Sequence, residues 1–131
     1  MYGKGFNKEG HDTCSPASGY DKSFLSRINL ERKQIDAVYP VGSVPKVVQV
    51  TPDNKYVLVS NWCSYTVSVI SVESGKTVKG IKIGRYPRGI AITKDSQFAY
   101  VAEMGGSHIH RINLSDFSKT LKNRYDRIKR V

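Results

Sequence analysis

Two histidines, two positions apart, have the residue type and spacing that metal chemistry needs. His108 and His110 alternate with Ile109 in a run typical of a β-strand, and side chains at positions i and i+2 of a strand lie on one face. Such a pair can hold a transition metal when a third donor is near, and the candidates are Glu103 and His11. The alternative, which we favour, is a structural role for both histidines without a metal.

Cations near a repeated proline form the second candidate site. Lys46 and Arg88 each follow a proline directly, and Arg85 lies just before the second proline. If these side chains face a common opening, they suit a carboxylate or a phosphate; otherwise they are solvated surface cations. Trp62 opens a nearby turn, where it either anchors a binding partner or packs inside the protein.

The two cysteines, Cys14 and Cys63, have neither the spacing of a metal site nor that of a redox pair. Either they form a disulfide, which implies an oxidising compartment, or they are two unpaired thiols. The sequence also lacks a nucleophile-elbow serine motif and a phosphate-binding loop. We therefore predict no cofactor.

Charge is concentrated near the end of the chain. The 131 residues carry 21 Lys and Arg against 11 Asp and Glu, a net charge of +10. The segment 118–131 contributes six cations: Lys119, Lys122, Arg124, Arg127, Lys129 and Arg130. A basic balance favours anionic partners, but no nucleic-acid-binding module accompanies it. Weak electrostatic binding of nucleic acid by this tail is one alternative function.

A 42-residue repeat positions all of these residues. Segment 41–46 returns as 83–88, segment 51–53 returns as 93–95, and a partial earlier copy includes Leu25. Short β-type runs at a period near 40 are typical of propeller blades, which bury their apolar faces only by stacking on neighbours. Closed propellers have four to eight blades, so this length predicts an all-β, incomplete propeller of four-stranded antiparallel blades.

The repeat divides the chain into five parts. We expect an irregular loop at 1–19, a partial blade at 20–41, a complete blade at 42–83, a further blade at 84–114 and a basic tail at 115–131. In the tail, four apolar side chains lie at spacings of four, four and three, which is one face of a short helix: Phe117, Leu121, Tyr125 and Ile128. This segment is a cap on the last blade, a basic partner helix or sequence foreign to the propeller.

The repeat resembles that of YVTN-type (YncE-like) β-propellers. The counterparts of the family's tetrapeptide are 58–61 (LVSN) and 100–103 (YVAE), and 84–91 (GRYPRGIA) is similar to its glycine–proline run. The resemblance implies a WD40-like repeat protein of the bacterial surface or periplasm. It also implies relatives that hydrolyse lactones.

A non-catalytic binding scaffold is the function that these features favour. Its loops would bind a protein, a cell-envelope polymer or an anionic small molecule, because loops on a rigid frame commonly carry binding sites. The alternative is a fragment of a lactonase-like hydrolase. We expect no membrane span, and we expect self-association through exposed blade faces. Asp53 and Asp95 are predicted to form turns rather than to act as catalysts.

Overall fold

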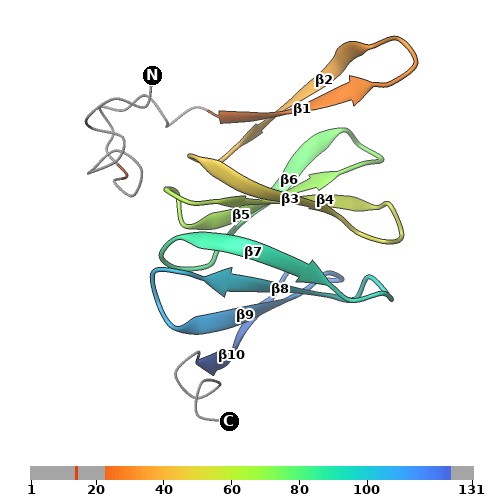
Figure 1. Cartoon of the computed structure of the whole chain (residues 1–131). Coiled ribbons are helices and arrows are strands. Elements are labelled where there is room, and N and C mark those ends of the chain that lie inside the picture. Colours follow the sequence, from red (N-terminus) through yellow and green to blue (C-terminus); the bar gives the residue numbers. More distant parts are fainter. Residues whose placement is uncertain (1–13, 15–22, 125–131) are drawn as a thin grey trace.

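The computed structural model describes residue 14 and residues 23–124. This part of the chain is all-β, with ten strands in three antiparallel sheets and no helix (Figure 1). Sheet A contains β1 (Ser23–Asn29) and β2 (Gln34–Val41). Sheet B contains β3 (Pro45–Val50), β4 (Tyr56–Asn61), β5 (Thr66–Ser71) and β6 (Lys76–Lys82) in that order. Sheet C contains β7 (Pro87–Ile92), β8 (Phe98–Glu103), β9 (His108–Asn113) and β10 (Lys119–Arg124), again in chain order.

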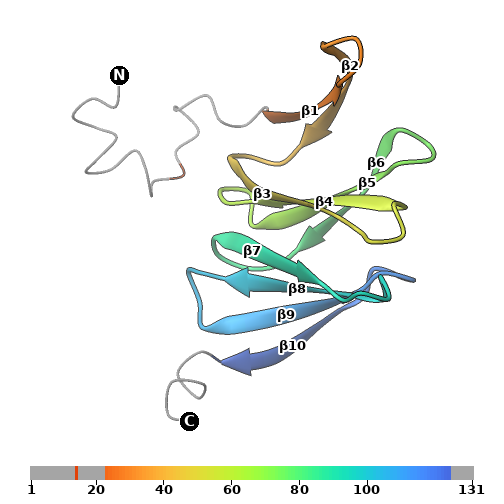
Figure 2. The same cartoon turned by 45° about the vertical axis from the view of Figure 1, so that its right-hand side comes forward.

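The three sheets stack face to face, as the turned view in Figure 2 makes clear. The main core lies between sheets B and C and includes Leu58 and Val67 from one side and Val101 and Ile112 from the other, all fully buried. A smaller core lies between sheets A and B, around Tyr39. Both faces of β4 and β5 are therefore buried, which explains why these strands are apolar at consecutive positions.

Repeated turns join the first and second strands of sheets B and C. In sheet B, the Thr51 hydroxyl donates to Asp53 Oδ1 (2.6 Å), and the Lys55 amide donates to the same oxygen (3.0 Å). These hydrogen bonds hold the pKa of Asp53 below its usual value. Thr93 and Asp95 repeat the arrangement in sheet C. The aspartates form turns, as predicted, because their carboxylates are used by their own backbone and by a neighbouring threonine.

The prediction of a C-terminal helix was wrong. Residues 119–124 form β10, which pairs with β9 and completes sheet C as its fourth strand. The helical spacing of four apolar residues is a weak local preference. Hydrogen bonding to the exposed edge of β9 is stronger, so tertiary pairing determines that this segment is a strand. Tyr125 and Ile128, with the basic residues beyond 124, lie outside the described residues.

The predicted N-terminal loop also lies outside the described residues, apart from Cys14. The same holds for residues 20–22 of the predicted partial blade, whose described remainder is the β1–β2 hairpin. Within the part of the chain that the structure describes, no helix has the length and apolar character of a membrane span.

Candidate functional site

Three of the connections between strands lie along one edge of the stacked sheets, on the left in Figure 1. This edge carries the β4–β5 turn, the β8–β9 turn and the loop that joins β6 to β7. Backbone hydrogen bonds tie these connections together: the Ile83 amide donates to the Tyr65 carbonyl (2.8 Å), and the Met104 amide donates to the Tyr86 carbonyl (3.0 Å). The loops are thus held by the sheets on both sides.

Five side chains at this edge form an aromatic–cation cluster: Lys46, Trp62, Tyr65, Arg85 and Tyr86. The Trp62 and Tyr86 rings stack with centroids 4.8 Å apart and planes 19° apart. The Tyr65 ring meets Tyr86 edge-on at 5.6 Å. Lys46 Nζ lies 5.6 Å from the Trp62 centroid, and Arg85 Cζ lies 5.5 Å from that of Tyr86. Two cations are therefore held against aromatic faces, a favourable arrangement.

The backbone around Tyr86 shapes this cluster. Tyr86 adopts a left-handed conformation (φ 58°), as does its repeat equivalent Val44 (φ 53°). Such angles are uncommon for residues other than glycine. A Cβ atom at Gly105 would lie 2.5 Å from Tyr86 Cδ2, so the adjacent turn needs glycine for the ring to fit. Trp62 Nε1 is buried and has no hydrogen-bond partner among the described residues.

The structure brings together three of the four cationic and aromatic residues predicted from sequence. Lys46, Trp62 and Arg85 belong to the cluster, whereas Arg88 is exposed on β7 outside it. Tyr65 and Tyr86 were not predicted. The sequence feature that could have pointed to Tyr86 is its place inside the repeated glycine–proline run. Its stacking on Trp62 was not predictable, because Trp62 lies 24 residues earlier in the chain.

A second polar cluster lies behind the loop, around Glu103. His110 Nε2 is 2.9 Å from Glu103 Oε2, and His108 Nδ1 is 3.5 Å from the same oxygen. The Arg85 amide donates to Glu103 Oε1 (3.1 Å). A Cβ atom at Gly84 would lie 2.5 Å from that oxygen, so glycine is needed for this close approach. Glu103 therefore links the two histidines to the loop that carries Arg85.

Sheet B has a neutral version of this cluster. At the equivalent repeat positions, Asn61 Nδ2 donates to Thr66 Oγ1 (3.1 Å) and to Ser68 Oγ (2.9 Å). The two clusters occupy the same place in consecutive blades, but only that of sheet C contains ionisable groups. This comparison favours a structural role for the Glu103 cluster, and only its ionisable groups are specific to sheet C.

The arrangement of His108, His110 and Glu103 gives no support to the predicted alternative of a metal site. Among the residues that the structure describes, no group of three or more His, Cys, Asp or Glu side chains is arranged to hold a metal ion. His11, one of the candidate third ligands, lies outside that part.

The environments of Glu103 and His110 shift both pKa values. Burial opposes ionisation of Glu103, but hydrogen bonds from His110 and the Arg85 amide outweigh it, so its pKa lies below the ordinary 4.5. Burial lowers the pKa of His110 below the ordinary 6.5, and the hydrogen bond to Glu103 offsets only part of this effect. Burial dominates at His110, because only 3% of the residue is exposed.

Acidification is therefore expected to destabilise the fold. The unfolded chain binds a proton at His110 near pH 6.5, whereas the folded chain resists it, so stability falls as the pH drops below 6.5. Glu103 adds to the loss below pH 4.5, where the unfolded chain takes up its proton first. One such group contributes at most about 1.4 kcal/mol per pH unit. Denaturant titrations at pH 7, 6 and 5 should show the slope, and His110→Gln should reduce it; an equal slope in this variant would contradict the assignment.

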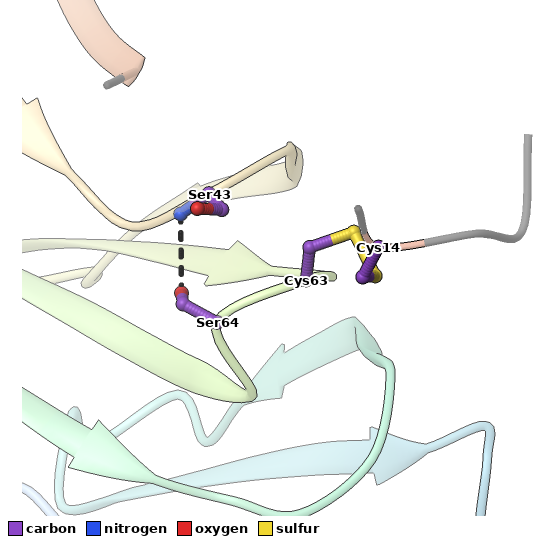
Figure 3. Close-up of a disulfide and its surroundings, with 4 residues drawn as sticks. All are labelled: Cys14, Ser43, Cys63 and Ser64. Carbon is purple, nitrogen blue, oxygen red and sulfur yellow. Dashed lines mark hydrogen bonds between the residues drawn. A yellow bond between two sulfur atoms is a disulfide. The ribbon is translucent and has the colours of Figure 1, made fainter. Parts of the chain in front are cut away.

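Cys14 and Cys63 form a disulfide at the same edge (Figure 3). Their Cα atoms are 5.1 Å apart, and the bond joins residue 14 to the β4–β5 turn. The neighbouring Ser43 amide donates to Ser64 Oγ (3.1 Å), which fixes the other side of this turn. The turn that carries Trp62 is thus held by a covalent bond and by a hydrogen bond to the preceding loop.

Comparison with known proteins gives the fold a context. No protein-family model matches the chain, and no curated protein matches it. Among solved structures, hydrazine synthase from Kuenenia stuttgartiensis is similar over 85% of this chain, with 28% identity and a TM-score of 0.72. Dihydro-heme d1 dehydrogenase NirN, in complex with DHE, is similar over 80% (16% identity, TM-score 0.68). A protein of unknown function from Desulfotomaculum acetoxidans is similar over 79% (13% identity, TM-score 0.60).

Hydrazine synthase and NirN are propeller proteins, and the stacked antiparallel sheets of this chain are similar to theirs. The described chain is an incomplete β-propeller. It spans 32%, 22% and 34% of the three neighbouring chains, respectively. Sheets B and C are accordingly four-stranded blades, and sheet A is part of one. The edge with the aromatic–cation cluster is one rim of this partial propeller.

Proposed function

We propose that this chain is a non-catalytic propeller segment that binds an anionic ligand at the aromatic–cation cluster. The observation that carries the proposal is the placement of two cations, Lys46 and Arg85, on a stacked Trp62–Tyr86 pair at a loop-bearing rim. Rings position the cations, and the cations supply the charge that attracts a carboxylate or a phosphate.

The surroundings of the cluster support binding rather than pure packing. Arg85 is exposed, and Lys46, Trp62 and Tyr86 are each only partly buried. A ligand can therefore approach the guanidinium without rearrangement of the core. Because aromatic faces lie beside the cations, we expect an aromatic carboxylate to bind more tightly than an aliphatic one.

Trp62 provides a direct measurement, because it is the only tryptophan of the chain. Benzoate is expected to change Trp62 fluorescence in a saturable titration, and acetate or neutral benzamide should bind more weakly. Lys46→Met and Arg85→Met should each weaken benzoate binding about tenfold, equivalent to about 1.4 kcal/mol.

Arg88→Met is the matched control, since it removes the same charge from an exposed position outside the cluster. The proposal fails if benzamide binds as tightly as benzoate, or if all three Met variants behave alike. Unfolding curves of each variant separate a loss of binding from a loss of structure.

The natural ligand on this proposal is a protein, a cell-envelope polymer or a small molecule that presents such an anion. We also propose an extracytoplasmic location and membership of the YVTN-type propellers. The Cys14–Cys63 disulfide supports the location, because disulfides persist in oxidising compartments.

A further inference from the structure

The loop segment that contains Arg85 and Tyr86 is held by the β8–β9 turn. Amides of this turn donate to the Arg85 carbonyl (2.9 Å) and to the Tyr86 carbonyl (3.0 Å). In sheet B, amides of the β4–β5 turn donate in the same way to the carbonyls of the repeat equivalents, Ser43 (3.1 Å) and Val44 (2.9 Å). Because both blades have this pair of hydrogen bonds, the pair belongs to the repeat and is not specific to Arg85.

The hydrogen bond of the Arg85 amide, in contrast, differs between the two blades. In sheet B, the Ser43 amide donates to Ser64 Oγ (3.1 Å), a hydroxyl of the turn itself (Figure 3). The repeat equivalent of Ser64 is Gly106, which has no hydroxyl. The Arg85 amide donates instead to Glu103 Oε1 (3.1 Å). Sheet C therefore replaces a neutral acceptor on the turn by a carboxylate at the end of β8.

Two glycines make room for this carboxylate. A Cβ atom at Gly106 would lie 2.5 Å from Glu103 Oε1, and one at Gly84 would lie equally close to the same oxygen. The carboxylate thus fits between the turn and the loop, and only 13% of the Glu103 side chain is exposed. A side chain at either glycine would displace the oxygen that accepts from Arg85.

His110 holds the other oxygen of the carboxylate. Its Nε2 lies 2.9 Å from Glu103 Oε2, and only 4% of the His110 side chain is exposed. Rotation of the carboxylate would therefore break its contact with His110 or its contact with the Arg85 amide. An ionised acceptor also makes a stronger hydrogen bond than a hydroxyl. The main chain of Arg85 is accordingly held more firmly than that of Ser43.

We propose that Glu103 is a positioning residue of the anion site, where its carboxylate fixes the main chain of Arg85 and so directs the guanidinium toward the ligand. The amide of Arg85 is bound to Glu103 and its carbonyl to the turn, so both polar main-chain groups are occupied. The side chain then leaves a fixed backbone beside Tyr86. A cation that is held in place before binding loses less conformational entropy when the ligand arrives. This inference rests on the proposed function, because it assigns Glu103 to the same site.

The arrangement in sheet B supplies the test, because it can be transferred to sheet C. Glu103→Asn introduces the residue found at the equivalent position of sheet B and removes the acceptor of the Arg85 amide. In the disulfide-bonded, full-length chain, this variant should bind benzoate at least about tenfold more weakly in the Trp62 fluorescence titration. Glu103→Asn/Gly106→Ser also adds the turn hydroxyl that sheet B uses, and it should regain the wild-type affinity. A direct electrostatic effect of the carboxylate would have the opposite sign, since loss of a negative charge favours an anion.

Hydrogen exchange of the Arg85 amide measures the positioning without any ligand. Exchange should be faster in Glu103→Asn than in the wild type, and it should be slow again in the double variant. Unfolding curves separate this local change from a loss of overall stability. Glu103→Gln, which keeps an acceptor oxygen at the same reach, should weaken benzoate binding less than Glu103→Asn does.

Asp95→Asn is the matched control, because it removes another hydrogen-bonded carboxylate of sheet C, at the opposite end of β8. It should leave benzoate binding unchanged. If the wild-type chain binds benzoate and Glu103→Asn binds it equally well, this inference alone is overturned. The same holds if the double variant binds as weakly as Glu103→Asn. Absence of benzoate binding by the wild-type chain would instead overturn the proposed function, and this inference with it.

Discussion

Loss of the Cys14–Cys63 disulfide is expected to lower the free energy of unfolding by about 2–4 kcal/mol. The bond closes a loop with a sequence separation of 49, and an unfolded chain with such a closed loop has fewer conformations. Reduction removes this restriction, so the unfolded state gains entropy relative to the folded one. The bond also fixes the turn that carries Trp62, so we expect the aromatic–cation cluster to loosen.

Thermal unfolding with and without reductant measures this effect, with Trp62 fluorescence as a local probe. The double variant Cys14→Ser/Cys63→Ser is the control: its unfolding temperature should equal that of the reduced chain and should not respond to reductant. If reduction leaves the unfolding temperature of the natural chain unchanged, the disulfide does not contribute to its stability.

Truncation of Leu58 is expected to have a comparable effect. Leu58→Ala should lower the free energy of unfolding by about 3–4 kcal/mol, because the side chain is fully buried between sheets B and C and its removal leaves a cavity. Leu121→Ala makes the same chemical change on β10, where the side chain is 56% exposed. This control should cost less than about 1 kcal/mol.

Denaturant titration of the two leucine variants distinguishes the contributions. A large difference between them would show that the contact between blades holds the partial propeller together. Similar values would instead mean that sheets B and C are stabilised mainly within themselves.

The repeat made the fold predictable. Strand alternation and turn residues such as Asp53 are local properties, and a 42-residue spacing that contains them is enough to indicate blades. The strands from Gln34 to Asn113 follow this prediction closely. The fourth strand of sheet C was missed, because β10 forms by pairing with β9 and not through a pattern of its own.

The candidate site was less predictable, because its contacts join residues far apart in the chain. Lys46, Trp62 and Arg85 were singled out by type, but their meeting place depends on Tyr86, whose ring stacks on Trp62 from the next blade. Glu103 was considered a metal ligand, whereas its carboxylate accepts from the Arg85 amide and lies against His110. Such pairings require the sheets to be stacked in a particular register.

The sequence by itself therefore determined that the chain builds four-stranded blades at a 42-residue interval, since period and turn chemistry are encoded locally. The tertiary structure alone decided which surfaces those blades bury. Val48 and Ile90 occupy the same repeat position, yet one is 45% exposed and the other 8%. The difference arises because burial depends on the neighbouring sheet: sheet B covers Ile90 fully, whereas the two strands of sheet A leave Val48 open to solvent.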